Sequence, residues 1–477
     1  MMKSRKGTEI SEGRVPRRRF IKLTGMTTAA FTIVPRYVLG GKGHVAPSDR
    51  VNVGVVGVGG RGKQNIQDLF KLDDVQVSAI ADPAEYWNLQ RFYYRSEAGR
   101  GPVKEMVESH YQKQIPTYRL AEYTDFRKML DERSEIDAVL CATPDHTHAY
   151  VSIKSMEAGK HVYCEKPLTH NIWEARRVSA LARQTGLATQ MGNQLHSVEG
   201  IRQTVEYLRA GVIGNVKEVH AWVPASRWTA GLQGLPEAST TVPDGFDWDI
   251  WLGPRAMRPF NEVYTPVTWR DFWDFGCGAM GDFGCHDLDA AVWGLDLPSP
   301  ASVELFPAGY NDEDIAPHGE IGYYRFPSKD QEELKVTWYS GGLRPERPPL
   351  IPKDLNLSSR GALYVGDKGV MLYEGRGRAP KVFPEGLLES VDLSNPTLPE
   401  TNGHHADWIE AIKGGSSPSS NFEYAAHLTE ITLLGVLSLR LEGKKITWDA
   451  VNMRAEGMPE ADKFIKEEVR PGWEMES

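Results

Sequence analysis

The chain has 477 residues, of which 40% are hydrophobic and 25% are charged, and its formal net charge at pH 7 is −9. This length allows two or three domains with complete cores, and this composition excludes a mainly disordered chain. The acidic balance argues against nonspecific binding of nucleic acid, which needs clustered Lys and Arg, and no apolar run reaches the about 18 residues of a membrane-spanning helix.

The first 46 residues differ in character from the rest of the chain. A basic head runs from Lys3 to Lys22, and a mildly apolar stretch rich in Thr and Ala follows it from Leu23 to Val34. This layout is typical of a signal peptide. The run Arg17-Arg18-Arg19-Phe20-Ile21-Lys22 resembles the twin-arginine export motif. We therefore expect residues 1–46 to be an export signal and linker that sends the protein to the periplasm, with a disordered basic arm as the alternative.

Residues 47–168 alternate apolar strands with helices. The strands that are apolar on both faces predict a parallel sheet covered by helices on both sides, which is a Rossmann-type α/β domain. A polar stretch, 86–114, is expected to hold one helix and a long loop. The strands are expected at 51–56, 75–81, 137–142 and 162–164, and the helices at 62–70, from Thr124 or Asp125 to 130, and at 148–158.

The turn after the first strand, Gly57-Val58-Gly59-Gly60-Arg61-Gly62, fits the pattern G-x-G-x-x-G. Gly57 and Gly59 let the backbone approach a pyrophosphate, and Gly62 lets the helix pack closely on the strand. Asp82 ends the second strand 82 − 62 = 20 positions later, where a carboxylate binds a ribose diol and repels a 2′-phosphate. The sequence therefore predicts NAD rather than NADP, although Arg61 within the turn could contact a phosphate instead.

Other residues at the ends of parallel strands are expected to line the cofactor crevice, because all of these strand ends meet at one edge of the sheet. His146 and His148 are two residues apart with no acidic partner clearly placed, so we expect a helix N-cap and a lining loop here and no metal site. The further residues assigned to the cofactor are Thr143, Pro144, His146, Glu165, Lys166 and Asn193.

From residue 169 the pattern changes to that of an α+β domain. The strands expected at 216–223, 301–305, 321–326, 334–339 and 362–373 form a large, mostly antiparallel sheet, and the helices expected at 171–185, 201–210, 405–413 and 424–442 pack against it. The long segment 224–274 is rich in Trp, Pro and Asp, and loops of that length in compact domains are usually functional. We expect residues 169–477 to bind the substrate and to mediate self-association.

Asp282 and His286 lie four residues apart in a predicted helix that begins in a glycine-rich turn, so they share one face. A carboxylate beside an imidazole orients the ring and raises its pKa, which gives a general acid or base near neutral pH. The alternative is an Asp at a helix N-terminus beside a core His. Cys277 and Cys285 flank this turn, and we favour simple packing for them over a disulfide or a metal site.

Taken together, these motifs resemble the glucose–fructose oxidoreductase/inositol dehydrogenase (Gfo/Idh/MocA) family over about residues 47–445. The resemblance is carried by the glycine turn, Asp82, Thr143-Pro144, Glu165-Lys166-Pro167 and the spacing Asp282-x-x-x-His286. It implies that Lys166, Asp282 and His286 are the catalytic residues and that the protein is a dimer or a tetramer. The aromatic segment Trp248–Trp273 looks like the exported branch of the family that acts on sugars.

Six residues are candidates for contact with a carbohydrate substrate. Three tryptophans offer flat faces for a sugar ring, and three polar side chains offer contacts to hydroxyl or carboxylate groups; packed aromatics and surface ion pairs are the alternatives. The candidates are Trp228, Trp269, Trp273, Arg227, Arg270 and His196.

Three functions are compatible with these motifs. The first is an NAD-dependent dehydrogenase that acts on a secondary hydroxyl of a sugar, glycoside or cyclitol. The second is a glycoside hydrolase that uses tightly bound NAD for transient oxidation, elimination, hydration and reduction. An exported enzyme cannot count on free NAD, which favours a retained cofactor. The third is a sugar- or nucleotide-binding protein without catalysis, against which the presence of Lys166, Asp282 and His286 argues.

Overall fold

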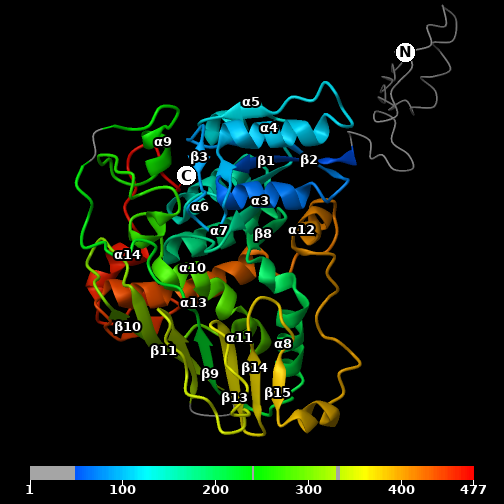
Figure 1. Cartoon of the computed structure of the whole chain (residues 1–477), viewed down its shortest axis with the longest axis vertical. Coiled ribbons are helices and arrows are strands. Elements are labelled where there is room, and N and C mark those ends of the chain that lie inside the picture. Colours follow the sequence, from blue (N-terminus) through cyan, green and yellow to red (C-terminus); the bar gives the residue numbers. More distant parts are fainter. Residues whose placement is uncertain (1–48, 239–240, 329–332, 477) are drawn as a thin grey trace, which may run out of the picture. The chain divides into compact units, whose positions relative to one another are not determined.

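The first of the two large sheets has six parallel strands in the order β5-β2-β1-β6-β7-β8. The computed structural model describes residues 49–238, 241–328 and 333–476 as one unit (Figure 1), and the expected export signal lies outside these residues. The strands are β1 (Val51–Val56), β2 (Val75–Ala81), β5 (Ala121–Tyr123), β6 (Ala138–Cys141), β7 (His161–Glu165) and β8 (Thr189–Gly192). The predicted Rossmann sheet is confirmed.

Local signals explain how the helices of this half begin. The side chain of Asp125 caps α5, and Asn171 and Glu174 form a capping box at the start of α7. Helix α6 begins at Asp145, three residues before the predicted start, so Pro144 is its N-cap and His148 lies inside the helix. The helices are α3 (Gly60–Leu69), α4 (Arg100–Tyr111), α5 (Phe126–Glu132), α6 (Asp145–Glu157) and α7 (Ile172–Thr185).

The polar stretch after Asp82 contains an element that the sequence did not predict. Two short strands, β3 (Trp87–Asn88) and β4 (Glu97–Ala98), pair antiparallel before α4. Leu89, Phe92 and Ala98 are buried in a small cluster with Val267. The hairpin is too short to give a hydrophobic period, and its buried contact is supplied by a segment about 170 residues away.

The second sheet has nine strands in the order β15-β14-β13-β9-β12-β11-β10-β16-β17, and all pairs except β9 with β12 are antiparallel. The single strand expected at 362–373 is instead the hairpin β13–β14, because Asp367-Lys368-Gly369 turns the chain. The strands are β9 (Val216–Trp222), β10 (Ser302–Ala308), β11 (Gly319–Pro327), β12 (Glu333–Tyr339), β13 (Gly361–Gly366), β14 (Val370–Tyr373), β15 (Lys381–Phe383), β16 (Ile446–Asp449) and β17 (Arg454–Ala455).

The long segment between β9 and β10 is ordered around its own aromatic core. Trp248, Trp251, Phe260, Phe272 and Phe275 are buried together there. The segment contains helix α9 (Trp248–Leu252) and the short 3-10 helix η3 (Thr268–Asp271), and it leads into α10 (Gly278–Asp287) and α11 (Asp289–Gly294). The remaining helices are α8 (Glu199–Arg209), α12 (His404–Ile412), α13 (Phe422–Arg440) and α14 (Asp462–Ile465), with 3-10 turns η2 (Gln194–Ser197), η4 (Glu385–Ser390) and η5 (Pro459–Ala461).

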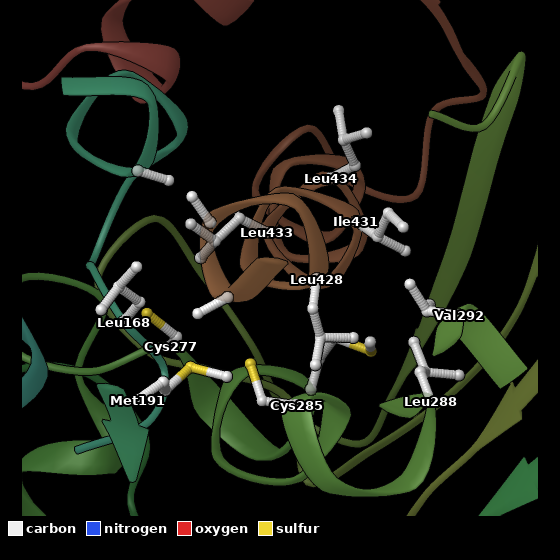
Figure 2. Packing of buried hydrophobic residues seen from close by; sticks show 14 of the residues in the cluster. Leu168, Met191, Cys277, Cys285, Leu288, Val292, Leu428, Ile431, Leu433 and Leu434 are labelled. Atoms are coloured by element: carbon white, nitrogen blue, oxygen red, sulfur yellow. The ribbon is translucent and has the colours of Figure 1, made fainter. Parts of the chain in front are cut away.

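One core holds the two halves of the chain together (Figure 2). Leu428 and Ile431 of α13 face Cys285 of α10 and Leu288, the residue between α10 and α11, while Leu168 from the end of the Rossmann half joins the same core beside Cys277 and Met191. Leu168 follows Lys166 by two residues, and Cys285 precedes His286. Because protein cores are close-packed, this shared core fixes the distance between the segment of Lys166 and the helix of Asp282 and His286.

Helix α12 returns from the second half of the chain to the first sheet (Figure 1). Its Trp408 and Ile409 are buried in the same cluster as Val53 of β1, and His405 Nε2 lies 3.2 Å from Asn65 Oδ1 in α3. The domain boundary at 168/169 stays a prediction. Strand β8 and helix α12 lie after it in the sequence, yet β8 is a strand of the first sheet and α12 packs in the core of that sheet. Within the described part of the chain, no helix combines the length and the apolar character needed to cross a membrane.

Candidate active site

A cavity of about 660 Å³ lies at the carboxyl ends of the parallel strands, between the glycine turn and α10. Its volume is within the range of sites for small molecules and cofactors, about 300–1,000 Å³. Most residues assigned from the sequence line it. These are Gly57, Gly59, Gly60, Arg61, Asp82, Thr143, Pro144, Glu165, Lys166, Trp228, Trp269, Arg270, Asp282 and His286.

Three glycines of the turn at one end of the cavity differ in the space around them. Gly57 has φ +82°, and a Cβ there would lie 2.7 Å from the backbone of Ala142. A Cβ at Gly62 would lie 1.9 Å from the carbonyl oxygen of Gly57, so α3 could not pack against the turn. A Cβ at Gly59, in contrast, would meet nothing within 4 Å. Gly57 and Gly62 are therefore needed by the fold, while Gly59 leaves open the space that a diphosphate needs.

Asp82 stands at the end of β2 beside this turn. Its Oδ2 accepts the N–H of Val58 and its Oδ1 accepts the N–H of Ala84, both at 2.8 Å. Burial raises the pKa of Asp82 above its ordinary value, although the two amide donors oppose this change. The amides hold the carboxylate in one orientation and leave lone pairs free for a diol. The turn and this carboxylate fit a dinucleotide cofactor.

Glu165 connects the glycine turn to the motif that contains Lys166. Its Oε1 accepts hydrogen bonds from Arg61 Nε at 3.1 Å, Asn65 Nδ2 at 2.8 Å and Gln194 Nε2 at 2.8 Å. Burial alone would raise the pKa of this carboxyl, but the charge of Arg61 and the amide donors outweigh burial and lower it. Glu165 is therefore a fixed anion that anchors α3, β7 and the loop after β8 around the base of Lys166.

Lys166 and Asp282 form the link between the two halves of the site. Lys166 Nζ lies 2.5 Å from Asp282 Oδ1 and 2.6 Å from the carbonyl oxygen of the same residue. Arg270 Nε lies 3.3 Å from the same carboxylate oxygen. Burial opposes ionisation of Asp282, but the charges of Lys166 and Arg270 outweigh it and hold the pKa of this carboxyl well below its usual range. The Asp282 carboxylate thus orients the lysine ammonium toward the cavity.

His286 lines the cavity one helical turn after Asp282. The expected rise in its pKa does not occur: burial, followed by the charges of Lys166 and Arg360, lowers the pKa of His286 well below its ordinary value. The Asp282 carboxylate accepts hydrogen bonds from Lys166 and Arg270 instead of orienting the imidazole. Helical spacing predicts that Asp282 and His286 share a face, but it does not predict which group the carboxylate binds. Here Lys166 and Arg270 bind it in place of the imidazole. The imidazole is therefore neutral at pH 7, with Nδ1 buried and without a partner among the described residues.

Asp145 also lines the cavity, and the sequence analysis did not assign it to the site. It is 4% exposed, and its Oδ2 accepts the N–H of Cys277 at 3.3 Å. Burial raises the pKa of Asp145 to about 7, although the nearby charges of Arg270 and Lys166 oppose the rise. Its position next to Pro144, at the end of a parallel strand, was the available signal.

Aromatic residues of the β3–β4 hairpin form another part of the cavity that the sequence did not reveal. Trp87, Tyr93 and Tyr94 line it, and a Cβ added to Gly60 would lie 2.4 Å from the Tyr94 ring. The Tyr93 ring lies 5.9 Å from that of Trp228, with an angle of 27° between the planes. The hairpin therefore lies against the glycine turn at Gly60 and closes part of the cavity.

Comparison with known proteins decides the family. A model described as "Oxidoreductase family, NAD-binding Rossmann fold" (GFO_IDH_MocA) matches residues 51–193, and "Oxidoreductase family, C-terminal alpha/beta domain" (GFO_IDH_MocA_C2) matches residues 204–325. The chain belongs to the Gfo/Idh/MocA oxidoreductase family. Its expected fold class, a Rossmann domain followed by an α+β domain with a mostly antiparallel sheet, is confirmed.

Curated relatives carry the name "Glycosyl hydrolase family 109 protein". Those of Shewanella sp. (strain W3-18-1) and Shewanella putrefaciens (strain CN-32 / ATCC BAA-453) are both 27% identical over 233 residues, which cover 45% of this chain and 47% of each relative. The match thus spans about half the length of these relatives.

Solved structures of similar fold include two proteins that are each 16% identical to this family member. One is the WlbA dehydrogenase from Bordetella pertussis in complex with NADH and UDP-GlcNAcA, with a TM-score of 0.54 and coverage of 84% of this chain and 99% of that one. The other is the aldose-aldose oxidoreductase from Caulobacter crescentus complexed with glycerol, with a TM-score of 0.54 and coverage of 84% and 100%. At this identity the likeness shows the fold alone.

Six residues that the sequence assigned to the site of this Gfo/Idh/MocA protein lie outside the lining of this cavity: Gly62, which packs against the turn, Arg227, which lines a second cavity, and four buried residues. His146 is fully buried between the carbonyl oxygens of Trp251, 3.0 Å from Nε2, and Phe275, 3.3 Å from Nδ1. Trp273 is 2% exposed and belongs to the main core. Both assignments rested on residue type, which does not distinguish a packed ring from a lining one.

The other two residues, Asn193 and His196, belong to a buried polar cluster. His196 Nδ1 lies 2.9 Å from Asp289 Oδ2, and Asn193 Nδ2 donates to the same atom at 3.1 Å. Both residues are fully buried, and the His196 ring stacks on Trp293 at 3.8 Å. They hold α11 against the loop after β8, so they support the site rather than contact a ligand.

The cysteines of the described chain are free and buried. Donor atoms of Cys141, His148 and Cys164 lie within 4.8 Å of one another, a grouping that could hold a metal ion. However, His148 Nδ1 lies 2.7 Å from the carbonyl oxygen of Pro167 and Nε2 lies 2.9 Å from that of Thr143. Both ring nitrogens are therefore already engaged, and we assign no metal to this group.

Proposed function

We propose that the protein is an NAD-dependent oxidoreductase that acts by hydride transfer on a secondary hydroxyl of a sugar, glycoside or cyclitol. The observation that carries this proposal is the placement of Lys166, hydrogen-bonded to Asp282 at 2.5 Å, in the same cavity as the glycine turn and Asp82. The solved structures of similar fold support the substrate class, because two of them are named as an aldose-aldose oxidoreductase and as a dehydrogenase bound to UDP-GlcNAcA.

The site residues divide the work as follows. Bound NAD supplies the hydride acceptor, held by the glycine turn and by Asp82 at the ribose. Lys166, oriented by Asp282, donates a hydrogen bond to the reacting hydroxyl and stabilises the oxygen as negative charge develops on it. His286 is neutral, and because Nδ1 is buried, Nε2 is the atom that accepts the hydroxyl proton. Its low basicity makes the charge of Lys166 all the more necessary.

A second candidate function uses the same site without net oxidation. Oxidation two carbons away from the glycosidic carbon gives a ketone that acidifies the C–H on the carbon between them. Loss of that proton expels the glycosidic substituent, which leaves protonated; water then adds to the resulting double bond, and the hydride returns to the ketone. The name of the curated relatives, glycosyl hydrolase family 109, favours this cycle. It requires that the same NAD stays in the protein, so it fits a cofactor that does not dissociate between the two hydride transfers.

One experiment separates these functions. The purified protein is examined for bound NAD(H) by absorbance and mass, and is then supplied with NAD and a panel of sugars and glycosides. Formation of NADH with a free sugar supports the dehydrogenase, whereas cleavage of a glycoside without net NADH supports the hydrolase. Bound NAD with neither reaction supports the non-catalytic binding protein. A protein that neither contains nor binds NAD contradicts both catalytic functions and the nucleotide-binding form of the third.

We further propose that the protein is exported by the twin-arginine route and self-associates as a dimer or tetramer. The basic head with Arg17-Arg18-Arg19 supports export, and the family resemblance supports self-association. Replacement of Arg17 and Arg18 by Lys should leave the protein in the cytoplasm of cell fractions. Light scattering of the purified protein measures the assembly, and a monomer at micromolar concentration would contradict it.

A further inference from the structure

A second cavity adjoins the site, beside the catalytic residues. Its volume is about 310 Å³, about half of the main cavity, and the two share four lining residues: Trp228, Arg270, Asp282 and Phe283. The shared residues include the carboxylate that holds Lys166, so the second cavity meets the main one where the substrate reacts. Trp228 is 40% exposed and lines both cavities.

Arg227 lines the second cavity and makes no direct ion pair with a described residue. The residue is 8% exposed, and the single hydrogen bond that its guanidinium makes to a described residue runs from Nη1 to the carbonyl oxygen of Leu232 at 3.2 Å. None of the ion pairs among the described residues includes it. A buried charge is costly unless it is paired, so this guanidinium is suited to an anion from outside the chain.

The two acids that line the same cavity are already engaged. Asp282 compensates Lys166 and Arg270. The oxygens of Asp271 accept the backbone N–H groups of Trp228 at 2.9 Å and Thr229 at 2.7 Å. Neither acid forms an ion pair with Arg227. The charge of Arg227 opposes the rise in the pKa of Asp271, but its Nε is buried without a partner among the described residues, so the guanidinium can still donate to an anion.

The backbone of the cavity also favours negative charge. Gly278 and Ala279, the first two residues of the ten-residue helix α10, line it, and the N-cap Cys277 makes no side-chain capping bond. The N-terminus of a helix carries free N–H groups and the positive end of the helix dipole. The N-terminus of α10 and the Arg227 guanidinium therefore line the same cavity, although they belong to two different segments of the chain.

We propose that this second cavity binds an oxyanion group carried by the substrate, and that Arg227 determines specificity for it. The inference rests on the proposed function: the reacting ring lies in the main cavity, and a substituent with a carboxylate, sulfate or phosphate enters the second one. The substrate is then an acidic glycoside or acidic sugar rather than a neutral monosaccharide.

The test compares two probes that differ in charge alone. The 4-carboxyphenyl and 4-carbamoylphenyl glycosides of glucose, galactose and N-acetylglucosamine are titrated into the NAD-loaded protein by calorimetry. For at least one sugar the acid should bind about 10-fold more tightly than the amide, which corresponds to one charge-assisted contact. In Arg227→Gln the ratio of acid to amide affinity should fall to about one, while the surface variant Arg325→Gln should keep it.

Further arms make the result decisive. Arg227→Lys keeps the charge and should retain part of the preference, and a folded Arg227→Gln protein is verified by circular dichroism. Sulfophenyl and phosphophenyl glycosides show which oxyanion is preferred. Equal binding of acid and amide, binding of neither, or a preference that persists in Arg227→Gln overturns the inference. Because the measurement is binding, it stands apart from the proposed function, which fails when NAD is not bound or no hydride is transferred.

Discussion

The two ends of the main cavity are built in different ways. At the nucleotide end, Gly57, Gly59 and Asp82 lie within 26 residues of sequence, and they act through backbone shape and amide hydrogen bonds. At the reacting end, Lys166 and Asp282 are 116 residues apart and act through paired charges. The first end depends on local conformation, while the second depends on the core in Figure 2 that places β7 against α10. The two ends should therefore fail separately when mutated.

The largest effect is expected from removal of the lysine charge. Lys166→Met should lower the rate of hydride transfer by about 1,000-fold or more, equivalent to about 4 kcal/mol, because it removes the charge that stabilises the developing alkoxide. NAD binding, measured by calorimetry, should stay within about tenfold of the wild type because the glycine turn is untouched. Lys104→Met on the surface of α4 is the control. An equal loss of NAD affinity and of rate would contradict the statement that the two ends of the cavity act independently.

The nucleotide end is tested by a glycine that the fold itself does not require. Gly59→Ala should weaken NAD binding about 100-fold, equivalent to about 2.7 kcal/mol, because the added methyl occupies the space for the diphosphate. Its melting temperature should stay within about 3 °C, since a Cβ at Gly59 meets nothing within 4 Å. Gly231→Ala, which is equally free of contacts, controls for the substitution. Unchanged NAD affinity would remove the turn from the cofactor site.

At the reacting end, Asp145 should make stability depend on pH. Its folded-state pKa, about 7, lies above the ordinary 3.8, so the folded protein binds more protons than the unfolded chain between these values. Stability should therefore fall as pH rises from 4 to 7, with a contribution of about 2 kcal/mol between pH 5 and pH 8. Urea unfolding of Asp145→Asn should lack this contribution. The exposed Asp131→Asn should retain it, and identical pH curves for Asp145→Asn and wild type would contradict the assignment.

The smallest effect concerns the choice between NAD and NADP. Asp82→Ser should shift the ratio of the two dissociation constants about 10-fold toward NADP, because the carboxylate no longer repels a 2′-phosphate. The variant also loses an acceptor for the Val58 or Ala84 amide, so the ratio is compared rather than either affinity alone. Asp73→Ser, at an exposed position before β2, is the control. A ratio unchanged from wild type would show that Asp82 does not contact the ribose.

The nucleotide end could be predicted almost completely from the sequence. Its strand, turn and acid obey short-range rules: Gly57 takes a positive φ, and a Cβ at Gly62 would strike the turn. The parallel sheet also followed from strands that are apolar on both faces. The hairpin at residues 87–98 could not be predicted, because its strands have two residues each and its buried partner, Val267, is far along the chain.

The reacting end was predicted in its residues but not in their contacts. Spacing placed Asp282 and His286 on one face, yet the carboxylate pairs with Lys166, which follows β7 of the first sheet 116 residues earlier, and no local pattern encodes this contact. His196 was expected at the substrate and instead pairs with Asp289 in the interior. Residue type alone could not show this, because a histidine that binds a ligand and a histidine that fills a polar core have the same local sequence requirements.

Helix α12 limits how freely this protein could exchange parts with its relatives. The family model of the NAD-binding fold ends at residue 193, but Trp408 and Ile409 complete the hydrophobic core beneath β1, about 215 residues later. A chimera that joins residues 49–193 to the remainder of a related protein would therefore inherit a foreign helix at this position. Recombination at residue 193, in the laboratory or in evolution, is expected to give a folded protein when α12 and residues 49–193 come from the same parent.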